Sequence, residues 1–255
     1  MEIKGCVCVV SGGASGLGEA TVRHLLEKGS KISILDIGEE RGQTIASELG
    51  DSVIFCKTDV TSEDSVQAAI NRTMEIFGAI HGAINCAGVG TPAKVLGKEG
   101  PMPIAQFNQV VQINLVGTMN VIRLAGEHIV KNSPNSDGER GVVVNTASVA
   151  AWEGQFGQAA YAASKAGVVG VTLPVAREFA DYGIRVVTIA PGLFETPMLA
   201  GLPDKVKESL YQMTLFPKRL GKSIEFAGLV SHIIENPMLN GEVIRLDGGM
   251  RMGAR

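Results

Sequence analysis

The chain has 255 residues, 45% of them hydrophobic, which is enough for one α/β domain with a buried core. Its formal net charge of −3 excludes the basic surface of a nucleic-acid-binding protein, and no apolar run approaches the roughly 20 residues that cross a bilayer. Residues 1–4 lead directly into a strand-like run, so we expect no signal or transit peptide and a cytoplasmic protein.

Short apolar runs alternate with longer amphipathic segments along the chain. The predicted strands are 5–11, 31–36, 53–57, 80–87, 141–148, 185–190 and 242–246. The predicted helices are 17–28, 39–49, 62–77, 105–131, 159–181 and 223–235. The strands are rich in β-branched residues and nearly continuously apolar, which is typical of a parallel sheet covered on both faces. This alternation predicts a single-domain, Rossmann-type α/β fold, a doubly wound parallel sheet of about seven strands with helices on both faces.

Three stretches interrupt this alternation, at 88–103, 132–140 and 191–221. Because ligands bind beyond the strand ends in open α/β sheets, all three are candidate substrate loops, and we place the substrate loops of the domain near 88–103 and 191–221. The first two stretches could equally be passive surface insertions. The apolar residues of the third suit a cover over an apolar ligand, or the buried face of a helix at 203–214.

Cysteine and histidine spacing gives no indication of a metal site or a disulfide framework. The four cysteines stand at positions 6, 8, 56 and 86, without a Cys-x-x-Cys or Cys/His pairing. We therefore expect free, buried thiols in a reducing compartment and no bound metal. The four histidines are scattered, and a catalytic histidine is not expected.

A glycine-rich turn, Ser11-Gly12-Gly13-Ala14-Ser15-Gly16-Leu17-Gly18, joins the first strand to the first helix. Glycine lets the backbone approach a pyrophosphate, and the helix N-terminus adds N–H donors and a favourable dipole. Glycine is common in this chain, so the position of the turn between strand and helix is the informative part. The predicted cofactor-binding residues of the turn are Gly12, Ser15, Gly16, Leu17 and Gly18.

Asp36 ends the second predicted strand. A carboxylate at this position accepts hydrogen bonds from the adenosine ribose and repels a 2′-phosphate, and no Lys or Arg follows it directly. These observations favour NAD over NADP. The alternative is that Asp36 only caps the turn that follows.

Small and polar residues also follow the third and fourth strands. Asp59 and Val60 come after the third, and Asn85, Ala87 and Gly88 end the fourth. The carboxyl ends of strands form the binding edge of an open α/β sheet, so we expect Asp59 to bond the adenine amino group and the small residues to allow close approach of a cofactor. Each could equally serve a turn.

Ser148, Tyr161 and Lys165 form the most informative group in the chain. Tyr161 and Lys165 are four residues apart, which places a phenol and an ammonium one turn apart on one helix face. Free tyrosine has a pKa of about 10, but a neighbouring cation favours the phenolate. A tyrosine tuned in this way can exchange a proton with an alcohol or a carbonyl, which complements hydride transfer to a nicotinamide.

Taken in order, these features resemble the short-chain dehydrogenase/reductase family over essentially the whole chain. The matching elements are the glycine turn at 12–18, Asp59, the run 85–88, Asn114, Ser148, Tyr161, Lys165, Pro191, Gly192 and Thr196. Cys86 departs from the family's Asn-Ala-Ala-Gly run, but it is small and we expect no functional consequence.

The stretches 145–163, 185–197 and 235–252 and the insertion at 90–103 more closely resemble one group of that family, the type 2 3-hydroxyacyl-CoA dehydrogenases, also known as 17β-hydroxysteroid dehydrogenase type 10. This resemblance implies a homotetramer that uses NAD. It also implies oxidation of secondary alcohols on acyl-CoA or similar apolar substrates.

The resemblance implies roles for single residues as well. Tyr161 exchanges the proton, Lys165 lowers the tyrosine pKa and holds the nicotinamide ribose, and Ser148 holds the substrate oxygen. Asn114 anchors a water that leads from Lys165 to solvent, and Gln155 touches the substrate. Ser148 could otherwise be an ordinary strand-end hydroxyl, and Asn114 an amide that satisfies a helix kink.

The remaining candidates flank this group. Gly192, after Pro191, permits close approach of the backbone to the cofactor, and Thr196 bonds its carboxamide or pyrophosphate. Trp152 and Phe156 are candidates for the substrate pocket because they lie between Ser148 and Tyr161 in the chain.

Three functions follow from these features. The leading one is an NAD-dependent dehydrogenase that interconverts 3-hydroxyacyl-CoA and 3-ketoacyl-CoA. The second is a dehydrogenase of steroids or other bulky secondary alcohols, which an apolar cover loop suits equally well. The third is an NAD-binding scaffold or sensor, although such a protein has no need of the Ser-Tyr-Lys group.

Overall fold

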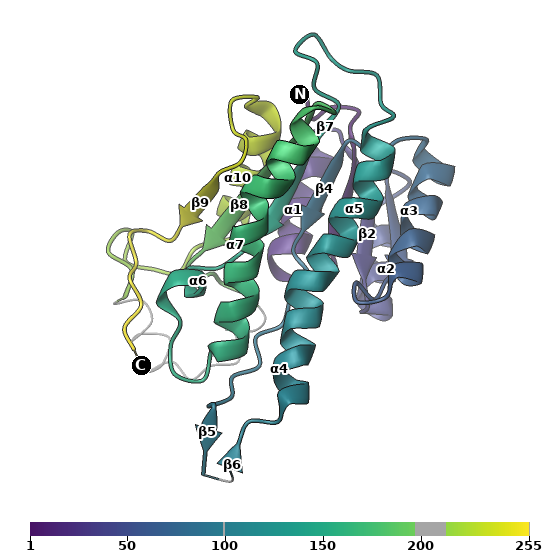
Figure 1. Ribbon diagram of the computed structural model, residues 1–255. Helices are drawn as coiled ribbons and strands as arrows, with labels where there is room; N and C mark the ends of the chain where they lie inside the picture. Colours follow the sequence, from purple (N-terminus) through teal and green to yellow (C-terminus); the bar gives the residue numbers. More distant parts are fainter. Residues whose placement is uncertain (99, 197–212, 255) are drawn as a thin grey trace.

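One sheet of seven parallel strands runs through the computed structural model, which describes residues 1–98, 100–196 and 213–254 (Figure 1). Its strands are β1 (Val7–Ser11), β2 (Lys31–Asp36), β3 (Val53–Lys57), β4 (Gly82–Asn85), β7 (Gly141–Thr146), β8 (Ile184–Pro191) and β9 (Val243–Leu246). Their order is β3-β2-β1-β4-β7-β8-β9. The predicted fold class and all seven predicted strands are confirmed.

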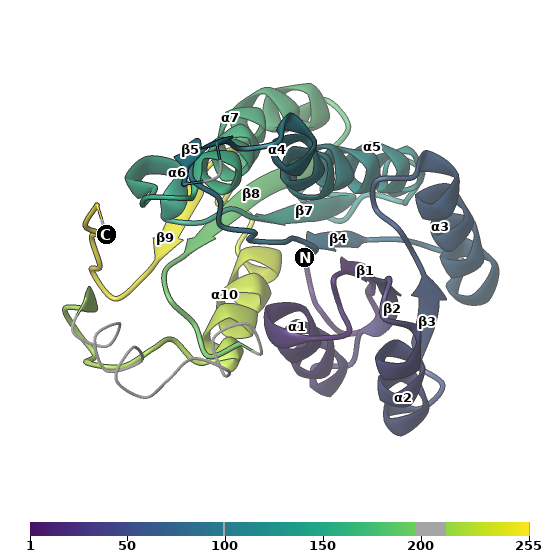
Figure 2. The same ribbon diagram turned by 90° about the horizontal axis from the view of Figure 1, so that it is seen from below.

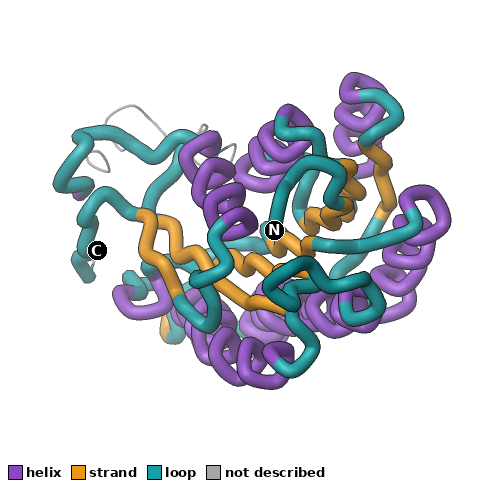
Figure 3. The backbone as a smooth tube through the Cα atoms, turned by 90° about the horizontal axis from the view of Figure 1, so that it is seen from above, coloured by secondary structure: helices purple, strands orange, loops and turns teal. Residues whose placement is uncertain are grey.

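Helices cover both faces of this sheet (Figure 2). One layer holds α1 (Gly16–Glu27), α2 (Glu39–Leu49) and α10 (Ser223–Glu235). The other holds α3 (Glu63–Phe77), α4 (Ile104–Val111), α5 (Gly117–Ile129) and α7 (Ala159–Ala180). The tube in Figure 3 shows the strands as a twisted band between these layers.

The apolar strands produce this three-layer arrangement because successive side chains point to opposite faces. In β7, Val142 and Val144 join the core beneath α1 and α10, whereas Val143 joins the core beneath α3 and α5. All three valines are fully buried. Because both faces of such a strand are buried, its interior positions carry apolar side chains. Polar side chains are therefore found where the strands end, at the edge of the sheet.

The strand order reverses between β1 and β4, which are hydrogen-bonded neighbours. The chain first winds outward from β1 through β2 to β3, and then from β4 to β9 on the other side. Loops leave the carboxyl ends of β1 and β4 in opposite directions at this point, and a crevice opens between them.

Some elements differ from the prediction. The helix expected at 105–131 is α4 followed by a π-helical turn, η1 (Gln112–Val116), and α5. A short helix, α6 (Ala150–Glu153), and a two-stranded arm of β5 (Leu96–Gly97) and β6 (Gly100–Pro101) were not predicted. The arm projects beyond α4 in Figure 1.

The stretch 132–140 is not a substrate loop. It lies before β7, at the end of the sheet opposite α6 and the β5–β6 arm (Figure 1). Within it, Glu139 is buried and forms an ion pair at 2.7 Å with buried Arg185 of β8. Its role is therefore structural, because the binding edge of the sheet is at the other end.

Helix α7 contains an 18-residue stretch that is long and apolar enough to cross a membrane by length and composition. The helix lies on the sheet, where Ser164, Lys165 and Thr172 are buried. Only 39% of this stretch is buried within the folded chain. The helix thus packs on the sheet with one face and leaves an apolar face exposed.

Candidate active site

A cavity of about 590 Å³ opens at the carboxyl edge of the sheet, over the β1–β4 crevice. Its lining includes Ser148, Tyr161 and Lys165. It also includes most of the predicted cofactor residues: Gly12, Ser15, Gly16, Leu17, Gly18, Asp36, Asp59, Val60, Ala87, Gly88, Pro191, Gly192 and Thr196. The structure thereby brings these residues from seven parts of the chain into one site.

The backbone of the glycine turn packs so closely against its neighbours that a side chain would not fit at Gly12 or Gly18. Gly12 has a φ of +67°, and a Cβ there would lie 2.6 Å from the backbone nitrogen of Ala87. A Cβ on Gly18 would overlap the carbonyl oxygen of Gly12. Ser15 caps α1 in an extended conformation with no side-chain hydrogen bond to the helix. The first N–H groups of α1 therefore remain available to a phosphate in the cavity.

Asp36 both caps a turn and lines the cavity. Its Oδ2 accepts a hydrogen bond from the N–H of Ala14 at 3.0 Å, and its Oδ1 accepts one from the N–H of Gly38 at 2.9 Å. Each carboxylate oxygen has two lone pairs, so both retain an acceptor site for a ribose hydroxyl. The turn cap and the ribose contact are compatible.

Nearby cations are engaged elsewhere. Arg41 pairs with Glu19 at 2.6 Å, and Lys57 pairs with Glu39 at 2.7 Å. The residue after Asp36 is Ile37, which is exposed and carries no charge. The described surroundings of Asp36 therefore offer no unpaired cation for a 2′-phosphate.

Asp59 and Asn85, two further predicted cofactor residues, have different places in the structure: Asp59 lines the cavity and Asn85 does not. Asp59 uses its Oδ1 for the N–H and hydroxyl of Thr61, which leaves its Oδ2 without a partner among the described residues. Asn85 is buried and does not line the cavity. Its amide accepts from Ser11 and donates to Asn145 at 2.9 Å, so it joins β1, β4 and β7. The structure places it beneath the cofactor loop, because its position in register points it into the sheet core.

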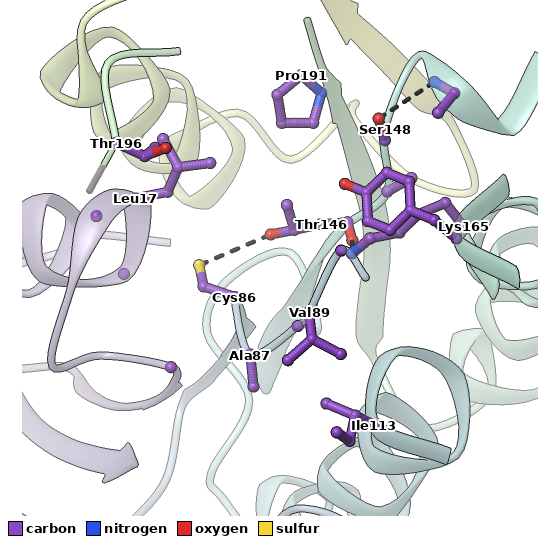
Figure 4. A pocket seen from close by; sticks show the side chains of 18 of the residues that line it. Leu17, Cys86, Ala87, Val89, Ile113, Thr146, Ser148, Lys165, Pro191 and Thr196 are labelled. Atoms are coloured by element: carbon purple, nitrogen blue, oxygen red, sulfur yellow. Dashed lines mark hydrogen bonds between the residues drawn. The ribbon is translucent and has the colours of Figure 1, made fainter. Parts of the chain in front are cut away.

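Lys165 and Tyr161 lie close together on the first turns of α7. The ammonium nitrogen of Lys165 is 5.8 Å from the centre of the Tyr161 ring and donates to the carbonyl oxygen of Thr146 at 2.7 Å. Figure 4 shows Ser148, Thr146 and Lys165 on one side of the cavity, apart from Leu17 and Thr196. The hydroxyl of Ser148 accepts from the N–H of Ala150 at 3.1 Å.

Burial dominates the electrostatics of this group. It raises the pKa of the Tyr161 phenol, while the hydrogen bond with Ser148 acts to lower it. Burial also lowers the pKa of Lys165 to about 8. Loss of hydration thus acts against the phenolate in the protein without cofactor, and the lowering of the tyrosine pKa by Lys165 stays a prediction.

Asn114 is fully buried in η1 and does not line the cavity. Its side chain accepts from the N–H of Val89 at 2.8 Å and donates to the Val89 carbonyl at 2.9 Å and to Ser164 at 3.0 Å. A Cβ on Gly88 would lie 3.1 Å from the Asn114 oxygen and 3.5 Å from the Lys165 nitrogen. The π-helical turn thus brings Asn114, the loop after β4 and Lys165 together.

Of the four predicted substrate residues, Ser148 lines the cavity, whereas Trp152, Gln155 and Phe156 do not. Trp152 is half exposed and stacks on the guanidinium of Arg245, 5.5 Å from its ring centre. Gln155 donates to the carbonyl of Gly253 at 3.1 Å. Phe156 is 60% exposed. The role of these three residues in substrate binding stays a prediction, because the cover segment 197–212 lies outside the described residues.

The cavity is also lined by residues that the sequence analysis did not predict as site residues. They include Val89, Ile113, Gln158, Leu193, Phe194 and Met252. Gln158 precedes Tyr161 by one helical turn, a spacing that could have identified it. No sequence pattern around Met252 indicates a role in the site, because only the tertiary structure brings this residue to the cavity. The predicted cover residues between 197 and 212 lie outside the described residues.

The four cysteines are free, and no group of His, Cys, Asp and Glu among the described residues could hold a metal ion. Burial raises the pKa of the Cys86 thiol, which lines the cavity, to about 11. This thiol is therefore neutral at physiological pH.

A glycine turn at a helix N-terminus, a carboxylate on the second strand and a Tyr-Lys pair beside a serine hydroxyl define a nicotinamide-dependent oxidoreductase of small molecules. A model of the short chain dehydrogenases matches residues 6–207. The chain belongs to the short-chain dehydrogenase family.

Its relatives include proteins named 3-hydroxyacyl-CoA dehydrogenase type-2. The chain is 52% identical over 252 residues to a 3-hydroxyacyl-CoA dehydrogenase type-2 of Drosophila melanogaster, covering 98% of this chain and 99% of the relative. It is 51% identical to the human protein of that name, covering 98% of this chain and 97% of the relative. A crystal structure of 3-hydroxyacyl-CoA dehydrogenase type-2 from Mycobacterium avium superimposes with a TM-score of 0.95 at 43% identity, covering 98% of each chain.

Proposed function

We propose that this protein is an NAD-dependent dehydrogenase that interconverts 3-hydroxyacyl-CoA and 3-ketoacyl-CoA. The observation that carries the proposal is the likeness to relatives of that name over 98% of the chain, together with Ser148, Tyr161 and Lys165 in one cavity.

The residues divide the chemistry as follows. The nicotinamide, when bound, accepts the hydride from the alcohol carbon or returns it. Ser148 holds the substrate oxygen beside the phenol, and Tyr161 takes up the hydroxyl proton in oxidation or supplies it in reduction. Lys165 has spare donors for the ribose hydroxyls, since the structure gives its ammonium one hydrogen bond, to Thr146.

NAD is preferred over NADP in this proposal. Its support is Asp36, whose carboxylate lines the cavity while the cations Arg41 and Lys57 are paired. A 2′-phosphate would face that carboxylate without a compensating charge.

A substrate panel tests the proposal. Acetoacetyl-CoA and longer 3-ketoacyl-CoA esters are offered with NADH and with NADPH, and the fall in reduced-nicotinamide absorbance is followed. We expect turnover of the CoA esters with NADH and weak turnover with NADPH. Preference for NADPH would contradict the argument from Asp36, and failure to reduce any CoA ester would refute the proposed substrate.

A second candidate is dehydrogenation of steroids or other bulky secondary alcohols. The apolar side chains of Val89, Ile113 and Met252 in the cavity wall favour it as much as an acyl chain. Keto steroids in the same panel separate the two. A scaffold or sensor role remains the third candidate, and it predicts NADH binding with no turnover of any ketone.

We also propose a homotetramer. The support is α7, whose apolar window is only 39% buried, and where Leu173 is 45% exposed. Such a face is covered when copies associate. Light scattering coupled to size-exclusion chromatography tests it. Free thiols at all four cysteines fit our proposal of a cytoplasmic location, which cell fractionation tests.

A further inference from the structure

The C-terminal tail, residues 251–254, lies beside α6 and β9, away from α1 and α2, in both Figure 1 and Figure 2. Met252 of this tail lines the cavity together with Ser148, Val149 and Tyr161. The glycine turn and Asp36 hold the opposite, nucleotide half. The tail therefore borders the part of the cavity that lies away from the nucleotide half.

Glu153, the last residue of α6, is the centre of the contacts that hold the tail. Its Oε2 accepts from the N–H of Met252 at 2.8 Å, and its Oε1 accepts from Arg245 at 2.8 Å. Arg251 lies 3.5 Å from the same Oε1. The side chain is 18% exposed, so these charge-assisted contacts are only partly screened by water.

Arg245 extends this arrangement into the sheet. It starts from β9, pairs with Asp247 at 2.8 Å and donates to the carbonyl of Met250 at 3.0 Å, and Met250 is fully buried. Further along the tail, Gln155 donates to Gly253 and the N–H of Phe156 donates to Ala254 at 3.1 Å. The side chain of Gln155 and the backbone of Phe156, two residues that were predicted to touch substrate, are thus occupied in holding the tail.

We propose that Glu153 is a positioning residue that fastens the C-terminal tail to the catalytic segment, and that Met252 is thereby a specificity-determining wall for the apolar acyl chain of the substrate. This inference rests on the proposed function. A thioether side chain suits this role because it is apolar and adapts its shape to chains of different length.

The test compares KM and kcat for acetoacetyl-CoA and for a ten-carbon 3-ketoacyl-CoA with NADH. We expect Met252→Ala to raise KM for the long ester about tenfold, with a smaller change for acetoacetyl-CoA. Glu153→Ala should show the same pattern. Glu153→Gln should lie between it and wild type, because an amide oxygen still accepts from Met252 but no longer pairs with Arg245.

Matched controls separate this effect from a general disturbance. Glu48→Gln removes a carboxylate that pairs with Arg23 on the surface, and Met238→Ala shortens a methionine that is 87% exposed. Both should leave KM for the two esters unchanged. NADH affinity, measured by fluorescence, should be the same in all variants, because the nucleotide half is untouched.

An equal ratio of the two KM values in Met252→Ala and in wild type would overturn the inference, as would a joint loss of kcat and NADH affinity. If Glu153→Ala does not fold, Met252→Ala decides. Wild-type protein that reduces no CoA ester refutes the proposed function instead. The same variants are then compared on whichever ketone of the panel it does reduce, with the same two outcomes.

Discussion

The ammonium nitrogen of Lys165 lies 5.8 Å from the centre of the Tyr161 ring, and Lys165 is buried while Tyr161 is partly buried. Burial lowers the pKa of Lys165 to about 8 and raises that of Tyr161, so at neutral pH the pair consists of an ammonium and a neutral phenol. A neutral phenol beside a fixed cation is prepared to give its proton to a ketone. The protein without cofactor is thus set to donate a proton, and a bound, positively charged nicotinamide would favour the phenolate instead.

Replacing Tyr161 by phenylalanine removes the proton donor and keeps the ring. We expect kcat for ketone reduction to fall by about a hundredfold to ten-thousandfold, with NADH affinity retained. Stopped-flow turnover and NADH fluorescence measure the two quantities. Tyr182→Phe is the control, because that side chain is half exposed and lies outside the cavity lining. Wild-type turnover in Tyr161→Phe would refute the assignment.

The buried ammonium of Lys165 makes stability depend on pH. Its pKa of about 8 in the folded protein is below the unfolded value of 10.5, so between these values the unfolded chain binds more protons and stability rises with pH. Between pH 8 and pH 9, we expect wild type to gain roughly 1 kcal/mol relative to Lys165→Met. Urea unfolding without cofactor measures the difference, in which the cysteine titrations common to both proteins cancel. Parallel stability curves would contradict the low pKa.

Asp36→Asn tests the choice of cofactor. The amide keeps the shape and one acceptor but loses the charge, so we expect NADH affinity to fall about tenfold and the preference over NADPH to narrow. Titration of both nucleotides by fluorescence measures it. Asp137→Asn, in the loop at the far end of the sheet, serves as the control. An unaltered preference would show that Asp36 acts only as a turn cap.

The ion pair of Glu139 and Arg185 is buried at the end of the sheet opposite the cavity. Glu139 also pairs with the N-terminal ammonium at 2.9 Å, so Arg185→Met removes one of its two cations. The substitution also leaves the carbonyl oxygens of Ile233 and Ile234 without the Arg185 donor, so it should lower the free energy of unfolding by about 3 kcal/mol. Turnover per folded molecule should not change. In Arg72→Met, which breaks an exposed pair with Glu75, the loss should stay below about 1 kcal/mol. Chemical denaturation compares the two, and equal losses would be inconsistent with a buried charge pair.

Much of this molecule was predictable from local pattern. The strands are nearly continuous apolar runs, and the glycine turn, Asp36 and the Tyr161–Lys165 spacing follow from short-range geometry. A four-residue spacing on a helix sets two side chains on one face whatever the helix packs against. For the same reason, residues at strand ends converge on one edge once the sheet is parallel.

Long-range packing settled the rest. Asn85 points into the sheet, Trp152 turns away to stack on Arg245, and the stretch 132–140 is at the wrong end of the strands. Met252, more than a hundred residues from Ser148 in the chain, reaches the cavity because Glu153 holds its backbone. Neighbours in sequence share a face only through local periodicity, whereas contacts between chain ends and loops depend on where the whole backbone has been folded. That is why the catalytic pair could be recognised in the amino-acid order, but the substrate wall could not.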